Sequence, residues 1–179
     1  MLKLTPVSIA LFSLVGLSLV SAPAASAQNE NNAIPRTQIP APTEPLKITF
    51  AGKSASWTPA QLAAQPQTTV TVYNEHTKAN ETYTGVPLIS LLTPLGVHPQ
   101  PRGKDMLLYL VVEGSDMYEV VYSIGEITPD VSKSTVIVAD TENGKPLAAD
   151  GPLKIVATGE NRPARWVRNL VAIRVLSAQ

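Results

Sequence analysis

Three arginines near the C-terminus are the residues whose type and spacing most directly suggest chemistry. Arg162, Arg165 and Arg168 recur at intervals of three after Gly159. This spacing would place Arg165 and Arg168 on one face of a short helical turn, where helix N-terminal amides favour anions. We predict a candidate anion-binding site on these grounds. The alternative is a solvated basic surface beside a core Trp166, because arginines are mostly exposed.

Other site chemistry is scarce in this chain. It contains no cysteine, so no thiolate is present as a nucleophile or metal ligand and no disulfide can form. We predict no catalytic residue and no set of metal ligands. The 14 basic and 14 acidic residues give a net charge of zero, and no basic stripe interleaved with aromatic residues is visible. The sequence therefore predicts no nucleic-acid partner.

The first 27 residues have the pattern of a secretory signal peptide. Lys3 forms a small positive region, and residues 7–20 form an apolar run that is short for a membrane span. Ala25-Ser26-Ala27 then offers a small-residue cleavage site. The signal has no twin-arginine pair, which indicates the general secretory route. We predict a secreted or periplasmic protein with no stable membrane span after cleavage; an uncleaved anchor is the alternative.

The rest of the chain divides into a linker and one domain. Residues 28–45 are rich in asparagine, proline, threonine and glutamine. This composition buries too little apolar surface to order itself, so we predict a disordered linker. Residues 46–179 are enough for one domain with a self-sufficient core.

Short strands separated by turns dominate the predicted domain. Capping boxes at Thr58–Gln61 and Ser123–Glu126 predict two brief helices, and Pro87 predicts a third over Leu88–Leu92. About seven or eight strands are expected, with examples at 46–50, 67–73, 82–84, 106–113, 117–122 and 135–140. This pattern predicts an α+β, strand-dominated mixed-sheet domain with a few short helices.

Several blocks of the domain resemble the sulfite-oxidase-like, molybdopterin-binding oxidoreductase family. Residues 84–92 (Thr-Gly-Val-Pro-Leu-Ile-Ser-Leu-Leu) are similar to its aromatic-x-Gly-Val-Pro-Leu-x-x-Leu-Leu element. We expect the glycine of this block to form a tight strand-to-helix turn. Residues 151–175, preceded by Gly144-Lys145-Pro146-Leu147, resemble the family's closing strands, and residues 114–123 resemble its substrate-side hairpin. The resemblance as a whole covers about residues 46–176.

The resemblance implies a molybdenum cofactor bound through a cysteine thiolate, which this chain lacks. In compact bacterial members that cysteine lies about a dozen residues before the Gly-x-Pro-Leu glycine, and the equivalent place here holds Tyr73. In the family, basic residues at the positions that resemble Arg165 and Arg168 help to hold the anionic cofactor. We expect no cofactor in this chain, and molybdopterin is the candidate if one is bound.

Two functions are compatible with these observations, and a third class stays open. The first is an exported, non-catalytic domain on a molybdopterin-oxidoreductase scaffold. It would bind a small anionic ligand or a protein partner in the groove where the family holds its cofactor. The alternative is a molybdopterin-dependent oxidoreductase with a non-cysteine metal environment or a metal supplied by a partner subunit. The third class is a structural adaptor with a filled groove.

Overall fold

The computed structural model describes residues 41–75, 77–147 and 150–179. The predicted signal peptide and most of the predicted linker lie outside the described residues. The described chain is irregular from Ala41 and enters its first strand at Leu46. Within the described ranges, no helix has the length and apolar character needed to cross a membrane.

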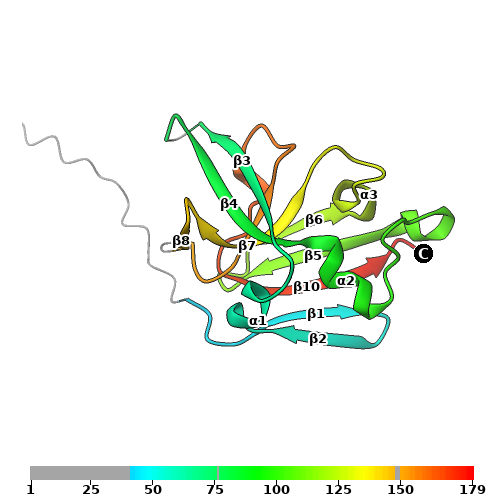
Figure 1. The fold of residues 1–179 in the computed structure, drawn as a ribbon. Helices are drawn as coiled ribbons and strands as arrows, with labels where there is room; N and C mark the ends of the chain where they lie inside the picture. The colour runs from blue at the N-terminus through cyan, green and yellow to red at the C-terminus, as the bar shows by residue number, and fades with distance from the viewer. Residues whose placement is uncertain (1–40, 76, 148–149) are drawn as a thin grey trace, which may run out of the picture. The chain divides into compact units, whose positions relative to one another are not determined.

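The described residues form ten strands in two sheets (Figure 1). The first sheet has the order β2-β1-β10-β5-β6, and the second has the order β3-β4-β7-β8 with β9 also paired to β7. All pairs are antiparallel except β1 with β10, which joins the two ends of the domain in parallel. The strands are β1 (Leu46–Phe50), β2 (Lys53–Trp57), β3 (Thr68–Asn74), β4 (Ala79–Pro87), β5 (Leu108–Gly114), β6 (Glu119–Ser123), β7 (Val136–Glu142), β8 (Lys145–Pro146), β9 (Lys154–Ala157) and β10 (Leu170–Ser177).

Short helices connect the strands. The helical segments are α1 (Pro59–Ala63), α2 (Leu88–Leu92), α3 (Ile124–Ile127) and the 3-10 turns η1 (Thr93–Leu95), η2 (Gly103–Leu107) and η3 (Pro163–Arg165). Three of them begin where the sequence predicts: α1, α2 and α3. At α1, Thr58 Oγ1 accepts from the Gln61 amide at 3.2 Å, and Gln61 Oε1 accepts from the Thr58 amide at 2.8 Å. Ser123 and Glu126 form the same reciprocal box at α3. Both predicted capping boxes are confirmed.

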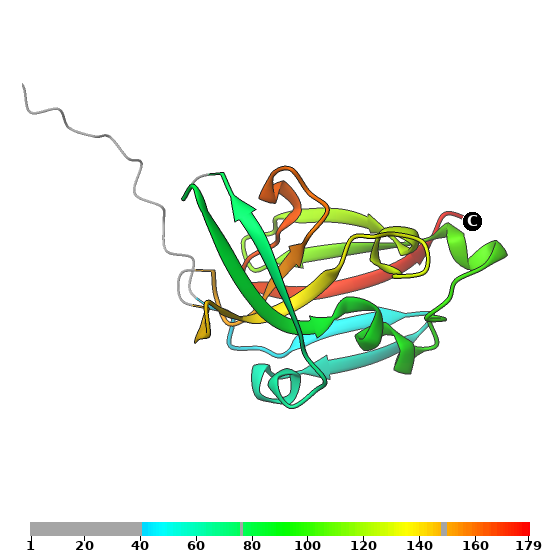
Figure 2. The same cartoon turned by 45° about the horizontal axis from the view of Figure 1, so that its top comes forward.

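The two sheets share one hydrophobic core, because alternate residues of each strand turn toward it. Along β5, for example, Leu108, Leu110 and Val112 are buried while the residues between them are partly exposed. Figure 2 shows the strands of the first sheet running side by side, with the long β3–β4 hairpin crossing them steeply and extending beyond them. The predicted α+β, strand-dominated mixed-sheet class is confirmed.

The region around β4 differs from the sequence-based expectation. The sequence predicts a short strand at 82–84, but β4 extends over Ala79–Pro87 because it pairs with β3 on one side and β7 on the other. Gly85 does not form the expected turn. It lies inside β4 at an irregularity of the β4–β7 pairing, and an added Cβ would stand 2.1 Å from the Val138 carbonyl oxygen. Close approach of two backbones is therefore what requires glycine there.

Candidate functional site

The three predicted site arginines do not share a helical face. Only Pro163–Arg165 is helical, and Trp166 leaves the helical region with φ −81° and ψ 86°. Because the turn ends there, Arg165 and Arg168 are not one helical turn apart, and that part of the expectation is wrong. A run of arginines at intervals of three gives helical spacing only if the backbone between them stays helical.

Arg165 is occupied by contacts within the protein. Its Nη1 lies 2.9 Å from Glu126 Oε1, and its Nε donates to Glu160 Oε1 at 2.8 Å. The guanidinium also lies 4.4 Å from the centroid of the Tyr122 ring, a cation–π geometry. Burial alone would raise the pKa of Glu126, but hydrogen bonds from Ser123 and Arg165 lower it overall. The carboxylates of Glu126 and Glu160 therefore already pair with the positive charge of Arg165, which leaves it less able to bind an anionic ligand.

Arg168 and Arg162 are more exposed. The Arg168 Nη1 lies 3.6 Å from Asp150 Oδ1, a looser contact than those of Arg165. Arg162 precedes η3 as an exposed residue in extended conformation. Anion binding by these arginines stays a prediction, which rests on Arg162 and Arg168 more than on Arg165.

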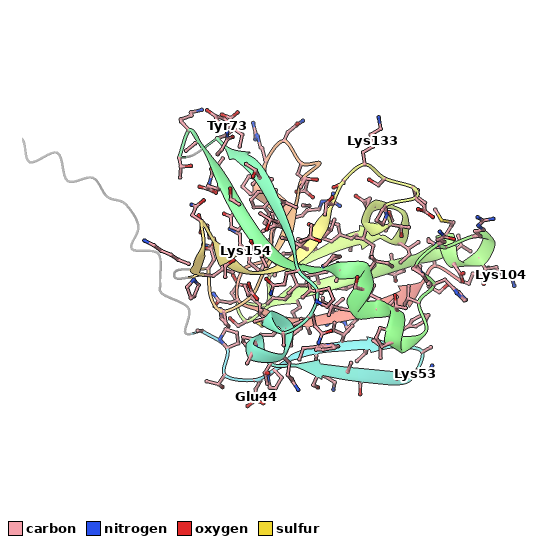
Figure 3. The ribbon with its side chains drawn as sticks, in the orientation of Figure 1. Glu44, Lys53, Tyr73, Lys104, Lys133 and Lys154 are labelled. Atoms are coloured by element: carbon pink, nitrogen blue, oxygen red, sulfur yellow. The ribbon has the colours of Figure 1, made fainter. Side chains whose placement is uncertain are left out.

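Tyr73, the residue at the expected cysteine position, lies on the outer face of β3. It is opposite Asn80 in the pairing with β4, and 55% of its surface is exposed. Figure 3 shows it near the tip of the β3–β4 hairpin, with Lys154 closer to the body of the domain. Tyr73 therefore does not fill an enclosed space between the sheets.

A buried network of charged and polar groups connects β4 to β9, and the sequence patterns described above do not predict it. We call it the Lys154 network; its members are Glu81, Tyr83, Asp150 and Lys154. Lys154 Nζ donates to Asp150 Oδ2 at 2.6 Å and lies 3.3 Å from Tyr83 Oη. Tyr83 Oη in turn donates to Glu81 Oε2 at 2.9 Å. Both Glu81 and Lys154 are only 7% exposed.

Neighbouring side chains complete the Lys154 network. Glu81 also accepts from Asn74 Nδ2 at 2.8 and 2.9 Å and from Thr77 Oγ1 at 2.9 Å. Burial alone would raise the pKa of Glu81, but the hydrogen bonds from Asn74, Tyr83 and Thr77 and the nearby Lys154 charge lower it overall.

Aromatic rings enclose the lysine of this network. Lys154 Nζ lies 4.9 Å from the Tyr83 ring centroid and 5.4 Å from that of Trp166. The two rings meet edge to face with centroids 5.8 Å apart. Burial first, and then the hydrogen bond to Glu81, raise the pKa of Tyr83 far above that of a free phenol. In the sequence, the one indication of this network is that Lys154 is the single charged residue in the otherwise apolar run Leu153–Ala157.

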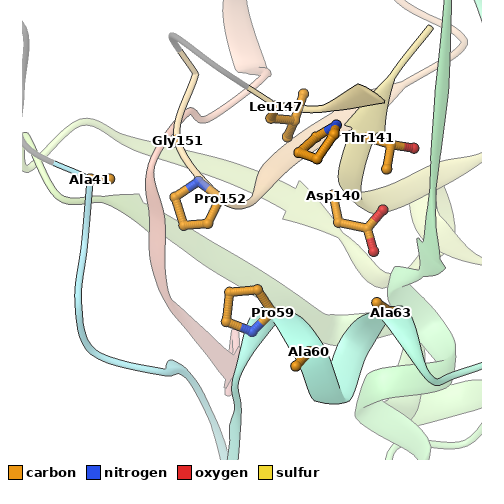
Figure 4. Close-up of a pocket in the computed structure, with 10 residues that line it drawn as sticks. Ala41, Pro59, Ala60, Ala63, Asp140, Thr141, Leu147, Gly151 and Pro152 are labelled. Atoms are coloured by element: carbon orange, nitrogen blue, oxygen red, sulfur yellow. The ribbon is translucent and has the colours of Figure 1, made fainter. Parts of the chain in front are cut away.

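An apolar pocket lies beside α1, between that helix, β7 and β8 and the chain before β9 (Figure 4). Its volume is about 470 Å³. We call it the α1 pocket; its lining residues are Ala41, Pro59, Ala60, Ala63, Asp140, Thr141, Pro146, Leu147, Gly151 and Pro152. Asp140 is the charged residue of this lining, and its Oδ2 accepts from Gln67 Nε2 at 2.7 Å. Asp140 Oδ1 is buried and has no hydrogen-bond partner among the described residues.

The residues of this chain do not fit molybdenum bound in the way that the resemblance implies. That site needs a thiolate, the chain has no cysteine, and the phenol at the expected position lies exposed on β3. Across the described ranges, no group of three or more histidine, aspartate or glutamate side chains is placed to hold a metal ion.

Comparisons with known proteins support the fold. No family model matches the chain, and no curated protein matches it significantly. Among solved structures, it is similar to the sulfane dehydrogenase SoxCD from Paracoccus pantotrophus, with 23% identity and a TM-score of 0.58. The match covers 74% of this chain but only 38% of the SoxCD chain. At this identity the likeness shows the fold alone, and the domain has the sulfite-oxidase-like fold that the sequence predicts.

Proposed function

We propose that this protein is an exported, non-catalytic binding domain that uses a molybdopterin-oxidoreductase scaffold to hold a small ligand. The observation that carries the proposal is the α1 pocket, whose volume of about 470 Å³ lies within the range of small-molecule sites. Alanine, proline and leucine form most of its lining. Proline and alanine lose little side-chain entropy when a ligand binds, which favours a pre-formed site.

The chemistry of the lining selects the class of ligand. An apolar body fits the alanine and proline surfaces, while Asp140 puts a negative charge in the pocket wall. A carboxylate repels an anionic ligand and attracts a cationic one, more strongly where apolar walls exclude water. We therefore assign to this pocket an apolar ligand with an amine or another hydrogen-bond donor. The anionic ligand predicted from the sequence belongs to the arginine region and not to this pocket.

Three probes of one skeleton test this assignment: benzylamine, benzyl alcohol and benzoate. Titrations followed by NMR should show the amine binding tighter than benzoate by about tenfold, roughly 1.4 kcal/mol. Asp140→Asn should remove the preference for the amine and leave the binding of benzyl alcohol unchanged. Asp130→Asn is the matched control, because it removes an exposed aspartate that does not line the pocket.

Two outcomes would contradict the assignment. Tightest binding of benzoate would show that Asp140 does not select the ligand. Chemical-shift changes confined to residues outside the pocket would show that the α1 pocket is not the site.

Export is tested separately by the N-terminus of the protein in its own cells. Cleavage after Ala27 predicts a mature chain that begins at Gln28. Mass spectrometry of the protein from the periplasmic or culture fraction should give this N-terminus. A full-length chain that begins at Met1 and stays in the cytoplasm would refute export without affecting the proposed pocket.

A further inference from the structure

The strand edges of the two sheets are protected to different degrees. An open edge presents unpaired backbone N–H and C=O groups, and natural proteins cover such edges or place charges and proline there. Along β6, Arg165 Nη1 donates to the Val121 carbonyl at 3.0 Å. From the same strand region, Tyr118 and Tyr122 donate their hydroxyls to the carbonyls of Ala164 and Arg165. The η3 segment therefore covers the β6 edge.

Three other edges carry their own protection. β8 has only two residues, Lys145 and Pro146. The edge of β9 is occupied by the following segment, where the Ile155 amide donates to the Val167 carbonyl at 2.9 Å. β2 is five residues long and begins with the charged Lys53.

β3 has none of these features. Its seven residues, Thr-Thr-Val-Thr-Val-Tyr-Asn, include no charge and no proline, and its pairing with β4 runs without a register shift over Thr69–Asn74. In the described residues, β4 is the only strand that pairs with β3, and β3 stands at the end of its sheet. Thr69, Thr71 and Tyr73 are exposed on its outer face. This is the longest uncharged edge in the described part of the chain.

We propose that the β3 edge pairs with the β3 edge of a second copy of this chain, joining the second sheets of two molecules. The sequence of the strand favours a second copy because it is self-complementary about Thr71. A two-fold axis there places Thr71 opposite its own copy, Thr69 opposite Tyr73, and Val70 opposite Val72.

This register is favourable at every position of the strand. It brings β-branched and aromatic side chains into cross-strand pairs, which stabilise antiparallel sheets, and it opposes no like charges. The inward faces also match, because Val70 and Val72 are both buried and lie across from each other. The register pairs Thr68 with Asn74 at the ends of the strand.

The first test is the oligomeric state of the purified full chain. Sedimentation velocity should show a reversible monomer–dimer equilibrium at concentrations up to roughly 100 µM. A chain that stays monomeric throughout this range would overturn the proposal, whether its edge is then open or covered by another segment or a peptide partner.

The absence of cysteine allows a sharper test of the register. In the proposed pair, the two Thr71 side chains lie directly opposite each other with Cβ atoms about 4.5–5.5 Å apart, at the upper end of the disulfide range. A small shift of the two strand edges would bring them within reach, so Thr71→Cys should form a covalent dimer on mild oxidation. Ser54→Cys on the β2 edge is the matched control and should stay monomeric under the same conditions. Equal cross-linking of the two variants would show random collision and would contradict the proposed register.

Charge substitutions at the same position give an independent readout. Thr71→Lys and Thr71→Glu each oppose like charges and should each weaken the dimer about tenfold or more. An equimolar mixture of the two should restore a dimer that contains one chain of each. Melting curves of the separate variants check that each is folded. A dimer that resists both single changes, in folded variants, would rule out the β3 edge.

Discussion

The Lys154 network and the α1 pocket both hold a carboxylate against apolar surroundings, but they pair it differently. In the network, Glu81 accepts hydrogen bonds from three side chains, and Asp150 is paired with Lys154 at 2.6 Å. Beside the pocket, Asp140 has one oxygen bonded to Gln67 and the other buried with no partner in the described residues. Glu81 and Asp150 are therefore charges that stabilise the fold, whereas Asp140 keeps an oxygen that could still accept a hydrogen bond.

The free-energy cost of burying a charge explains why this difference in pairing matters. A buried charge is tolerated when opposite charge and hydrogen bonds compensate its lost hydration, and removal of one partner leaves the other uncompensated. The network should therefore respond strongly to substitution in its stability. The pocket should respond in ligand binding instead.

Lys154→Met should produce the largest loss of stability. Methionine keeps the length of the side chain but leaves the partly buried Asp150 with only the looser Arg168 contact at 3.6 Å. Breaking a buried ion pair costs roughly 3–5 kcal/mol of unfolding free energy, and the remaining Arg168 contact should put the loss toward the lower end of that range. Lys78→Met is the control, because Lys78 and Glu75 form an ion pair of similar length, 2.7 Å, between mostly exposed side chains. An exposed pair contributes only about 0–1 kcal/mol. Urea unfolding of both variants measures the contrast, and equal losses would contradict it.

Tyr83→Phe should have an intermediate effect. The change keeps the ring that packs on Trp166 but removes the hydroxyl that bonds Glu81 and Lys154. Loss of a hydrogen bond to a buried charged group costs about 1–3 kcal/mol. Thermal and urea unfolding should agree on this loss. A variant as stable as the wild type would show that Glu81 is satisfied without the tyrosine.

Acid should weaken the Lys154 network through Glu81. Its pKa in the folded state is lowered, so its contribution to stability is complete above the ordinary glutamate pKa and is lost as the pH falls through the folded value. Stability should therefore decline below about pH 5, and Glu81→Gln should make the decline shallower. Glu126, whose pKa is also lowered, contributes in the same direction, so Glu126→Gln is the comparison. If the unfolding free energy of Glu81→Gln falls with pH as steeply as that of the wild type, Glu81 does not contribute to the loss of stability in acid.

Asp140→Asn should have the smallest effect on stability. The amide oxygen still accepts from Gln67, so the unfolding free energy should change by no more than about 0.5 kcal/mol. Urea unfolding checks this value beside the probe titrations. A loss above about 2 kcal/mol would place Asp140 with the charges that hold the fold.

Local signals explain which parts of the structure the sequence could predict. The capping boxes at Thr58 and Ser123 depend on neighbours within three residues, and both are present. The fold class follows from their alternation with short apolar strands. The full length of β4 depends on pairing with β3 and β7 and could not be read locally.

The site was harder to predict because its contacts are distant in sequence. Lys154 meets Tyr83 across 71 residues, and Arg165 contacts the Val121 carbonyl across 44. The sequence shows the arginines but not the carboxylates that occupy Arg165. It places Tyr73 at the expected cysteine position but not on an exposed strand edge. Nothing in the spacing of Asp140 indicates that it lines a pocket with α1.

If this scaffold is used for binding and not for molybdenum chemistry, the protein from its native compartment should contain almost no molybdenum. The protein should be purified from its native compartment without chelator, and its molybdenum content measured by mass spectrometry against protein concentration. We expect well below about 0.1 molybdenum per chain, because no thiolate is present to bind it. Close to one molybdenum per chain would show that the protein binds the metal without a cysteine ligand, as the oxidoreductase alternative requires.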